Sequence, residues 1–209
     1  MVSLEVARTL SEMKPGTHAV LIYDSAENRR DILMTHMRLG VHDARLAYVC
    51  SDESPEQVES WMRGADIEVD NLRRENRLAI DRGDDVYFKD GRPDIPSIIG
   101  YFSFLAFGSK WQGLNGGVRI AGDMTGFIRR KMVPDLETLE RRLHRTFEFP
   151  AIGLWAYDLT ELSNSGHLES LLRLLHSQNP VIFAGPRGAS VLMPDTTRAA
   201  IPSQQVRAK

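Results

Sequence analysis

Short apolar runs alternate with amphipathic stretches along most of the chain. The continuous apolar run at 18–23 is typical of a strand buried on both faces of a sheet. Ser25 follows it as a helix N-cap, and the helix that begins there places Ile32 and Leu33 near one face. The same alternation predicts strands at 44–50, 77–80, 118–123, 151–158 and 181–184. It also predicts a helix that begins at Pro55 with Ser54 as its N-cap, and helices that span 95–111, 134–147 and 168–176.

Strands that alternate with helices favour βαβ units and a mostly parallel sheet covered on both faces. We therefore predict an α/β fold, a three-layer sandwich around a central sheet. The chain divides into an amphipathic N-terminal helix within 1–15, one α/β domain over 16–190, and a polar, flexible tail over 191–209. A chain of 209 residues suits one domain of this kind.

Composition and charge exclude several classes of protein. The formal net charge of −2 gives no general attraction to nucleic acid or to anionic membranes. No apolar run approaches the roughly 20 residues that span a bilayer, and the N-terminus lacks the features of a signal peptide. We expect a cytoplasmic protein. Cys50, the single cysteine, is either a redox-responsive thiol or, as its apolar neighbours favour, a small buried hydrophobe.

Polar side chains follow several of the predicted strands. Tyr23-Asp24-Ser25, Cys50 to Glu53, Asp123 to Thr125, and Tyr157-Asp158 all stand at carboxyl ends. Ligands of open parallel sheets bind outside these ends, so we expect the side chains to converge on one edge. Each residue alone is equally well explained as a helix cap or turn former. The prediction of a binding site therefore depends on their convergence.

The loop after the first strand does not have the composition of a phosphate-binding loop. Such a loop is rich in glycine and carries a lysine, so that backbone N–H groups and an ammonium cradle the phosphates. Residues 23–28 contain neither glycine nor lysine, and they carry the carboxylates Asp24 and Glu27. Anion repulsion at this loop argues against triphosphate binding.

Several motifs together resemble a known family. They are G-T-H-A-V-L-I-Y-D-S-A-E-N, A-R-L-A-Y-V-C-S-D-E-S-P, G-V-R-I-A-G-D-M-T, W-A-Y-D, and a leucine-rich helix followed by N-P-V-I. In this order and spacing they resemble the MEDS domain, the methanogen/methylotroph, DcmR sensory domain, over residues 16–185. The resemblance implies a degenerate RecA/KaiC-like domain, a P-loop NTPase fold that lacks the P-loop.

The resemblance also carries expectations for function and for individual residues. The family is regarded as a sensor of small hydrocarbon derivatives, and it occurs in transcription regulators and with signalling histidine kinases. His18 and Tyr23 match its opening motif, and Asp123 matches the strand-end acid that resembles a Walker B carboxylate. Tyr157 and Asp158 match the late motif. Val20 stands where the family has a cysteine, which argues against His/Cys metal coordination at the first strand.

Three functions remain open at this stage. The first is a non-catalytic sensory domain that binds a small organic molecule and needs no cofactor or metal. It acts through a regulatory protein partner or a homo-oligomer, and it contacts neither nucleic acid nor membrane directly. The second is an enzyme that holds Mg²⁺ or Mn²⁺ between Asp24, Asp52, Asp123 and Asp158. The third is a pseudo-ATPase with residual nucleotide binding. For the first function, the predicted ligand-binding residues are His18, Tyr23, Asp24, Asp123, Thr125, Trp155, Tyr157 and Asp158.

Overall fold

The computed structural model describes residues 2–146, 149–176, 180–186 and 188–193. Of the tail predicted over 191–209, residues 194–209 lie outside the described ranges. The strands are β1 (Thr17–Tyr23), β2 (Arg45–Cys50), β3 (Leu78–Arg82), β4 (Phe88–Lys89), β5 (Arg92–Pro93), β6 (Val118–Asp123), β7 (Ala151–Asp158), β8 (Val181–Gly185) and β9 (Gly188–Leu192). The helices are α1 (Leu4–Glu12), α2 (Ala26–Arg38), α3 (Pro55–Gly64), α4 (Val69–Arg74), α5 (Gly83–Tyr87), α6 (Ile95–Trp111), α7 (Thr125–Arg129), α8 (Val133–Thr146), α9 (Leu159–Asn164) and α10 (Leu168–His176).

The central sheet has the strand order β3-β2-β6-β7-β1-β8-β9. All neighbouring strands from β3 to β8 run parallel, and β9 pairs antiparallel with β8. The predicted α/β class with a mostly parallel sheet is therefore confirmed. The parallel arrangement brings the carboxyl ends of β1, β2, β6 and β7 to one edge, where the polar residues of the sequence were expected to meet.

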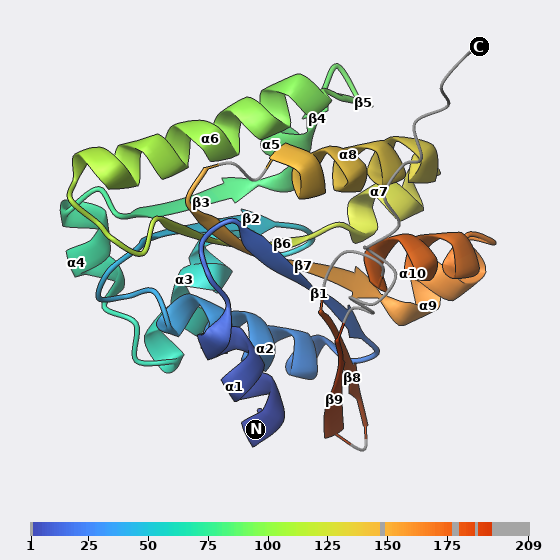
Figure 1. The fold of residues 1–209 in the computed structure, drawn as a ribbon, viewed down its shortest axis with the longest axis horizontal. Helices are drawn as coiled ribbons and strands as arrows, with labels where there is room; N and C mark the ends of the chain where they lie inside the picture. The colour runs from blue at the N-terminus through green and yellow to red at the C-terminus, as the bar shows by residue number, and fades with distance from the viewer. Residues whose placement is uncertain (1, 147–148, 177–179, 187, 194–209) are drawn as a thin grey trace, which may run out of the picture.

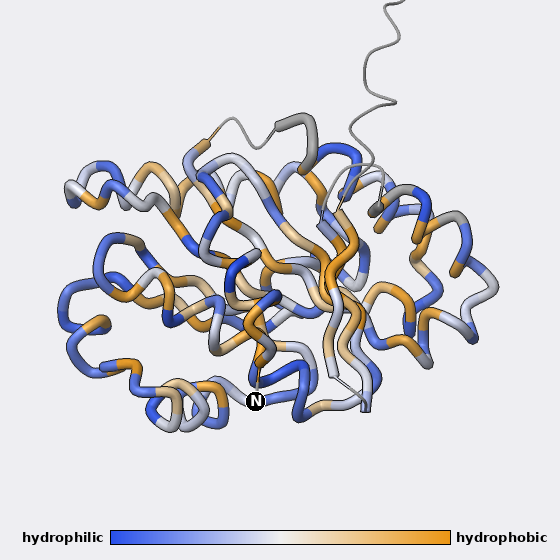
Figure 2. The backbone as a smooth tube through the Cα atoms, turned by 60° about the horizontal axis from the view of Figure 1, so that its bottom comes forward, coloured by the Kyte–Doolittle hydropathy of each residue, from blue (hydrophilic) through white to orange (hydrophobic). Residues whose placement is uncertain are grey.

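Helices cover both faces of this sheet and make a three-layer molecule (Figure 1). The first core lies beneath α5 to α10 and contains Phe102, Leu139 and Trp155. The second lies beneath α1 to α4 and contains Leu10, Leu33 and Met62. The hydrophobic stretches gather on the strands in the middle of the molecule, while the helices alternate between hydrophobic and hydrophilic residues (Figure 2). None of the helices within the described residues has both the length and the apolar character needed to cross a bilayer.

Two serines start the helices that follow β1 and β2, as the sequence predicts. The Ser25 hydroxyl accepts a hydrogen bond from the backbone N–H of Asn28, and the Ser54 hydroxyl accepts one from Gln57. Both side chains satisfy a backbone donor that the first helical turn leaves without a partner. These caps fix where α2 and α3 leave the carboxyl edge of the sheet.

Several short elements were not predicted. The sequence pattern placed the last strand at 181–184, but β9 follows it and extends the sheet to Leu192. A β4–β5 hairpin turns at Asp90 and Gly91, both with positive φ, as a two-residue turn between such strands requires. Helices α4, α5, α7 and α9 have only five or six residues, too few to show a helical period.

Candidate functional site

Five polar side chains meet at the carboxyl edge of the sheet, on the face covered by α2 and α3. They are Tyr23 from β1, Arg29 from α2, Tyr48 from β2, Glu53 from the loop after β2, and Asp123 from the end of β6. All five are buried. We call this group the Arg29 cluster. It draws on segments that are about 100 residues apart in the sequence, as the contact between Tyr23 and Asp123 shows.

Asp123 and Glu53 hold the Arg29 guanidinium between them. Arg29 Nη1 lies 2.6 Å from Asp123 Oδ2, and Arg29 Nη2 lies 3.5 Å from Glu53 Oε1. The Tyr23 hydroxyl donates to the same Asp123 oxygen at 2.6 Å, and the Tyr48 hydroxyl donates to Glu53 Oε1 at 2.7 Å. The Arg29 side chain also lies over the Tyr23 ring, 5.3 Å from its centre. The cluster is therefore one continuous network of charge-assisted contacts.

The strand order explains how Tyr23 reaches Asp123. Strand β7 lies between β1 and β6, and Ala156 of β7 is the register partner of Asp123. Tyr23, Ala156 and Asp123 face the same side of the sheet, where the alanine methyl leaves room for the tyrosine ring to pass over β7. A larger side chain at position 156 would stand between the hydroxyl and the carboxylate.

The second oxygen of Asp123 organises the neighbouring strand end. The backbone N–H of Thr125 donates to Asp123 Oδ1 at 2.8 Å, and the Thr125 hydroxyl accepts from the backbone N–H of Asp158 at 3.0 Å. Asp158 in turn caps α9 by accepting from the N–H groups of Thr160 and Glu161. Asp123 therefore has both oxygens engaged, and Asp158 acts as a helix cap.

Burial and charge act together on the titratable groups of the cluster. Burial and the neighbouring Asp123 carboxylate raise the pKa of Tyr23, and burial and Glu53 raise that of Tyr48 well above its ordinary value. Burial alone would lower the pKa of Arg29, but the carboxylates of Asp123 and Glu53 outweigh it and raise that pKa. Both tyrosines are therefore neutral donors and Arg29 is a fixed cation at physiological pH.

A surface hollow opens beside this cluster. It has a volume of about 690 Å³ and lies between the start of α2, the loop after β2, and α3. We call it the edge hollow. Its lining residues are Ala26, Glu27, Arg29, Arg30, Asp52, Glu53, Gln57 and Trp61. Arg29 and Glu53 thus belong both to the buried network and to the wall of a space large enough for a small molecule.

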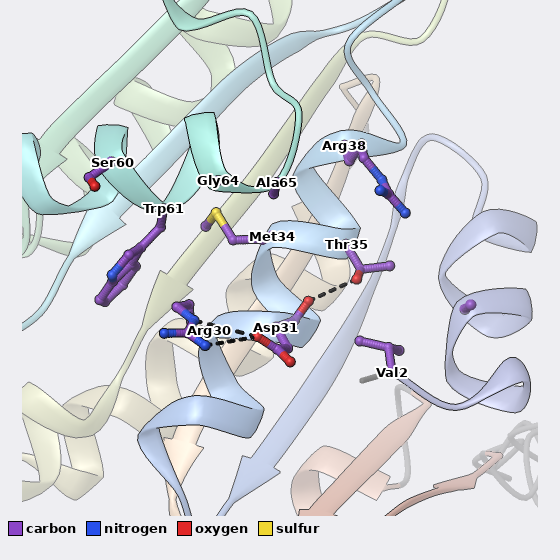
Figure 3. Close-up of a pocket in the computed structure, with 11 residues that line it drawn as sticks. Val2, Arg30, Asp31, Met34, Thr35, Arg38, Ser60, Trp61, Gly64 and Ala65 are labelled. Atoms are coloured by element: carbon purple, nitrogen blue, oxygen red, sulfur yellow. Dashed lines mark hydrogen bonds and ion pairs between the residues drawn. The ribbon is translucent and has the colours of Figure 1, made fainter.

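A second hollow adjoins the first on the same side of the molecule. It has a volume of about 500 Å³ and lies among α1, α2 and α3, with Arg30 and Trp61 shared between the two hollows. Figure 3 shows Arg30 with its guanidinium directed toward Asp31, whose carboxylate it contacts at 3.3 Å. Together the two hollows follow the outer surface of α2 from the sheet edge toward α1.

A second buried polar group lies on the opposite face of the sheet, beneath α8. The Glu140 carboxylate of α8 accepts a hydrogen bond from the Tyr157 hydroxyl at 2.5 Å, and its other oxygen lies 3.5 Å from His18 Nε2. Burial and Glu140 raise the pKa of Tyr157 well above its ordinary value. Glu140 therefore ties α8 to both β7 and β1 through the interior.

We expect Tyr157→Phe to lower the free energy of unfolding by about 1–3 kcal/mol, because it removes the hydroxyl that a buried carboxylate needs. Tyr101→Phe is the matched control, since Tyr101 also donates to a carboxylate, that of Asp81, but from a half-buried position. Urea unfolding of both variants measures the difference. An equal loss of stability in the two variants would mean that burial of Glu140 does not increase the contribution of its hydrogen bond with Tyr157.

A family model described as MEDS, the methanogen/methylotroph, DcmR sensory domain, matches residues 17–174, more than half of the chain. The chain belongs to the MEDS family. The sequence resemblance is thereby confirmed. A sensory role is what membership of this family suggests. Among curated proteins, none matches the sequence.

Two solved structures are similar to this MEDS domain. One is a KaiC-like protein from Pyrococcus horikoshii OT3, with a TM-score of 0.56 and 12% identity over 82% of this chain and 72% of that one. The other is an uncharacterized protein from Pyrococcus horikoshii in complex with an unknown peptide, with a TM-score of 0.63 and 15% identity over 93% of this chain and 90% of that one. At these identities the likeness shows the fold, which is RecA/KaiC-like.

The structure separates the predicted ligand-binding residues of the MEDS domain into two groups. Tyr23, Asp123 and Thr125 come together at the carboxyl edge, with Asp158 next to them and Asp24 exposed on the rim. Tyr157 also stands at a strand end, but its side chain points away from this group, because alternate residues of a strand face opposite sides of the sheet. His18, Trp155 and Tyr157 face the α8 side, where Trp155 packs against Phe102 and His18 and Tyr157 flank Glu140.

Sequence reasoning missed Arg29, Tyr48 and Glu140, whereas Glu53 was expected at this edge as part of the segment from Cys50 to Glu53. The sequence carries a signal for Arg29. It stands three and four positions before the apolar residues Ile32 and Leu33, which places it on the buried face of α2. An arginine on the apolar face of a helix indicates a buried carboxylate partner. The burial of Glu53 had no such signal, because it lies in a polar loop outside any periodic element.

The four aspartates considered for a metal site have separate partners. Asp123 binds Arg29, Asp52 contacts Arg129 at 2.5 Å, Asp158 caps α9 and Asp24 is exposed. Within the described ranges, no group of three or more His, Cys, Asp or Glu side chains is placed to hold a metal ion. Cys50 is buried, and burial raises the pKa of its thiol to about 12, as expected for a small hydrophobe rather than a reactive thiol.

Proposed function

We propose that this MEDS domain is a non-catalytic sensory module that binds a small molecule at the carboxyl edge of its sheet and acts through a protein partner. The observation that carries the proposal is the position of Arg29. Its guanidinium forms an ion pair with Asp123, the carboxylate that by resemblance matches a Walker B acid. A nucleotide-bound metal at Asp123 would have to displace a cation that is already paired there.

The loop after β1 supports the same proposal. In the sequence it lacks the glycines and lysine that cradle phosphates, and in the structure it places Asp24 and Glu27 on the exposed rim. The N-terminus of α2 also has its Ser25 cap in place. Phosphate groups would therefore meet two carboxylates at a helix N-terminus where the Asn28 N–H already has a partner.

A surface on α6 supports action through a partner. Phe104, Phe107 and Trp111 are 65%, 53% and 83% exposed, and their spacing places them along one side of the helix. Aromatic side chains gathered on an exposed helix are typical of surfaces that bind other proteins. This surface lies on the opposite side of the sheet from the edge hollow, so a ligand and a partner would not compete for space.

A thermal-shift screen tests the proposed function. We expect no shift with ATP or ADP in the presence of Mg²⁺, and a shift with a member of a panel of small alcohols, amines, acids and halogenated compounds. A ligand at about 100 times its dissociation constant adds about 2.7 kcal/mol of stability. Stabilisation by ATP and Mg²⁺ that Asp123→Asn abolishes would contradict the proposal and establish a pseudo-ATPase in its place.

A further inference from the structure

The Arg29 cluster contains one more buried negative charge than positive charge. Asp123 and Glu53 are both buried carboxylates, and Arg29 is the one guanidinium that contacts them among the described residues. Its contact with Asp123 at 2.6 Å is much closer than its contact with Glu53 at 3.5 Å. Glu53 is thus the weakly neutralised member. A buried carboxylate that is incompletely paired is costly to the folded state.

One oxygen of Glu53 shows directly that this carboxylate is incompletely paired. Its Oε1 accepts from the Tyr48 hydroxyl and faces Arg29, whereas Oε2 has no hydrogen-bond partner within the described part of the chain. The Glu53 side chain is only 2% exposed, and it lines the edge hollow. Buried acceptors normally have a donor, so this oxygen marks a place where a donor from outside the chain would be stabilising.

The rest of the edge hollow fits a donor that carries positive charge. Glu27 and Asp52 line it together with Glu53, and both are exposed acids at its mouth. Arg29 and Arg30 also line it, but each already contacts a carboxylate, Asp123 and Asp31 respectively. Asp52 is likewise paired, with Arg129, so the carboxylates that an entering ligand meets are the exposed Glu27 and the weakly neutralised Glu53. Both would repel an anion and attract a cation.

Trp61 gives the hollow an apolar wall. The indole is half-buried on α3, and Figure 3 shows it on the side of α3 that faces Arg30 of α2. An aromatic face next to carboxylates is the environment that recognises organic ammonium groups, through cation–π attraction and contact with their carbon atoms. A hydrated inorganic cation would gain little from such a wall.

We propose that the edge hollow binds a small organic cation, an alkylammonium or a guanidinium compound, through an N–H donated to Glu53 Oε2 and an apolar body packed against Trp61. The inference rests on the proposed sensory function and names the class of its ligand. The cation supplies the charge that the Arg29 cluster lacks. It also bridges the loop after β2 to α2 and α3, so that its binding stiffens the contacts between these segments.

Three compounds with one carbon skeleton test the charge requirement: butylammonium, butanol and butyrate, at matched ionic strength. We expect butylammonium alone to raise the melting temperature of the full chain. Glu53→Gln keeps the shape of the side chain and removes its charge, so we expect it to weaken butylammonium binding at least about tenfold. Glu56→Gln is the matched control, since Glu56 is exposed on α3 outside the hollow and its replacement leaves the affinity unchanged.

A second variant tests the apolar wall and serves if Glu53→Gln does not fold. We expect Trp61→Leu to weaken butylammonium binding several-fold, because it removes the aromatic face. Equal stabilisation by butanol, failure of butylammonium to bind, or an unchanged affinity in Glu53→Gln would each overturn the inference. None of these outcomes contradicts the sensory role, which the thermal-shift screen of the wider compound panel tests. Stabilisation by ATP and Mg²⁺ would overturn the sensory role itself.

Discussion

Arg29→Met is expected to lower the free energy of unfolding by about 3–5 kcal/mol at neutral pH. Methionine fills a similar volume but leaves the buried carboxylates of Asp123 and Glu53 without a cation, and breaking a buried ion pair from one side has a cost of this size. Urea unfolding, followed by circular dichroism, measures the change. The effect is large because the other contacts of Asp123, from Tyr23 and Thr125, are donors without a full charge.

Two comparisons isolate the ion pair. Arg30→Met, one position along α2, removes a half-buried arginine whose contact with Asp31 lies near the surface, and we expect it to cost less than about 1 kcal/mol. Asp123→Asn added to Arg29→Met removes one of the two carboxylate charges that the single variant leaves without a cation. The double variant should therefore lose less stability than the sum of the losses in the two single variants. Equal losses in Arg29→Met and Arg30→Met would show that the Arg29 cluster does not depend on its guanidinium.

The stability of the domain is expected to fall by about 2.5 kcal/mol between pH 7 and pH 4.5 through His36 alone. His36 is fully buried on α2, where its Nε2 lies 3.1 Å from the backbone oxygen of Ile120 and its Nδ1 lies 3.3 Å from Arg119 Nη1. Because arginine can only donate, Nδ1 accepts and Nε2 carries the proton. Burial and the Arg119 cation lower the pKa of His36 from 6.5 to about 3.

The direction of the effect follows from proton binding. Between pH 6.5 and about 3 the unfolded chain holds a proton on His36 that the folded chain does not, so acid favours unfolding throughout this window. Unfolding measured at several pH values gives the slope. His36→Gln provides a donor and an acceptor without a titrating group, so its slope should be shallower by about one proton. His42→Gln, at an exposed position, should keep the original slope. Identical slopes in both variants would place the acid sensitivity elsewhere.

The sequence predicts the layers of this fold well and its short elements poorly. The buried strands read as continuous apolar runs, and Ser25 and Ser54 mark the starts of two helices, because these signals are local. Strand β9 alternates between exposed and half-buried residues at the edge of the sheet, so it has no apolar run to detect. Asp90-Gly91 carried a hairpin signal, but the strands on either side have only two residues each.

The candidate site was predictable only as an edge. The strand-end pattern predicted that Tyr23, Glu53 and Asp123 lie at one edge, because parallel strands place such residues together. Which side of the sheet each side chain faces depends on strand register, and that separated Tyr157 from this group. The partners Arg29 and Glu53 come from a helix and a loop whose positions over the sheet are set by packing. No local pattern in the chain encodes that packing.

The position of β1 in the sheet has a consequence for how the chain is made. This strand comes first in the sequence, yet its neighbours β7 and β8 begin at residues 151 and 181. During synthesis, β2 can pair early with β3 and then with β6, whereas neither edge of β1 can pair until the last third of the chain has been made. Contacts between such distant segments slow folding and leave apolar strands exposed meanwhile. We therefore expect nascent chains that stop before β7 to need a chaperone.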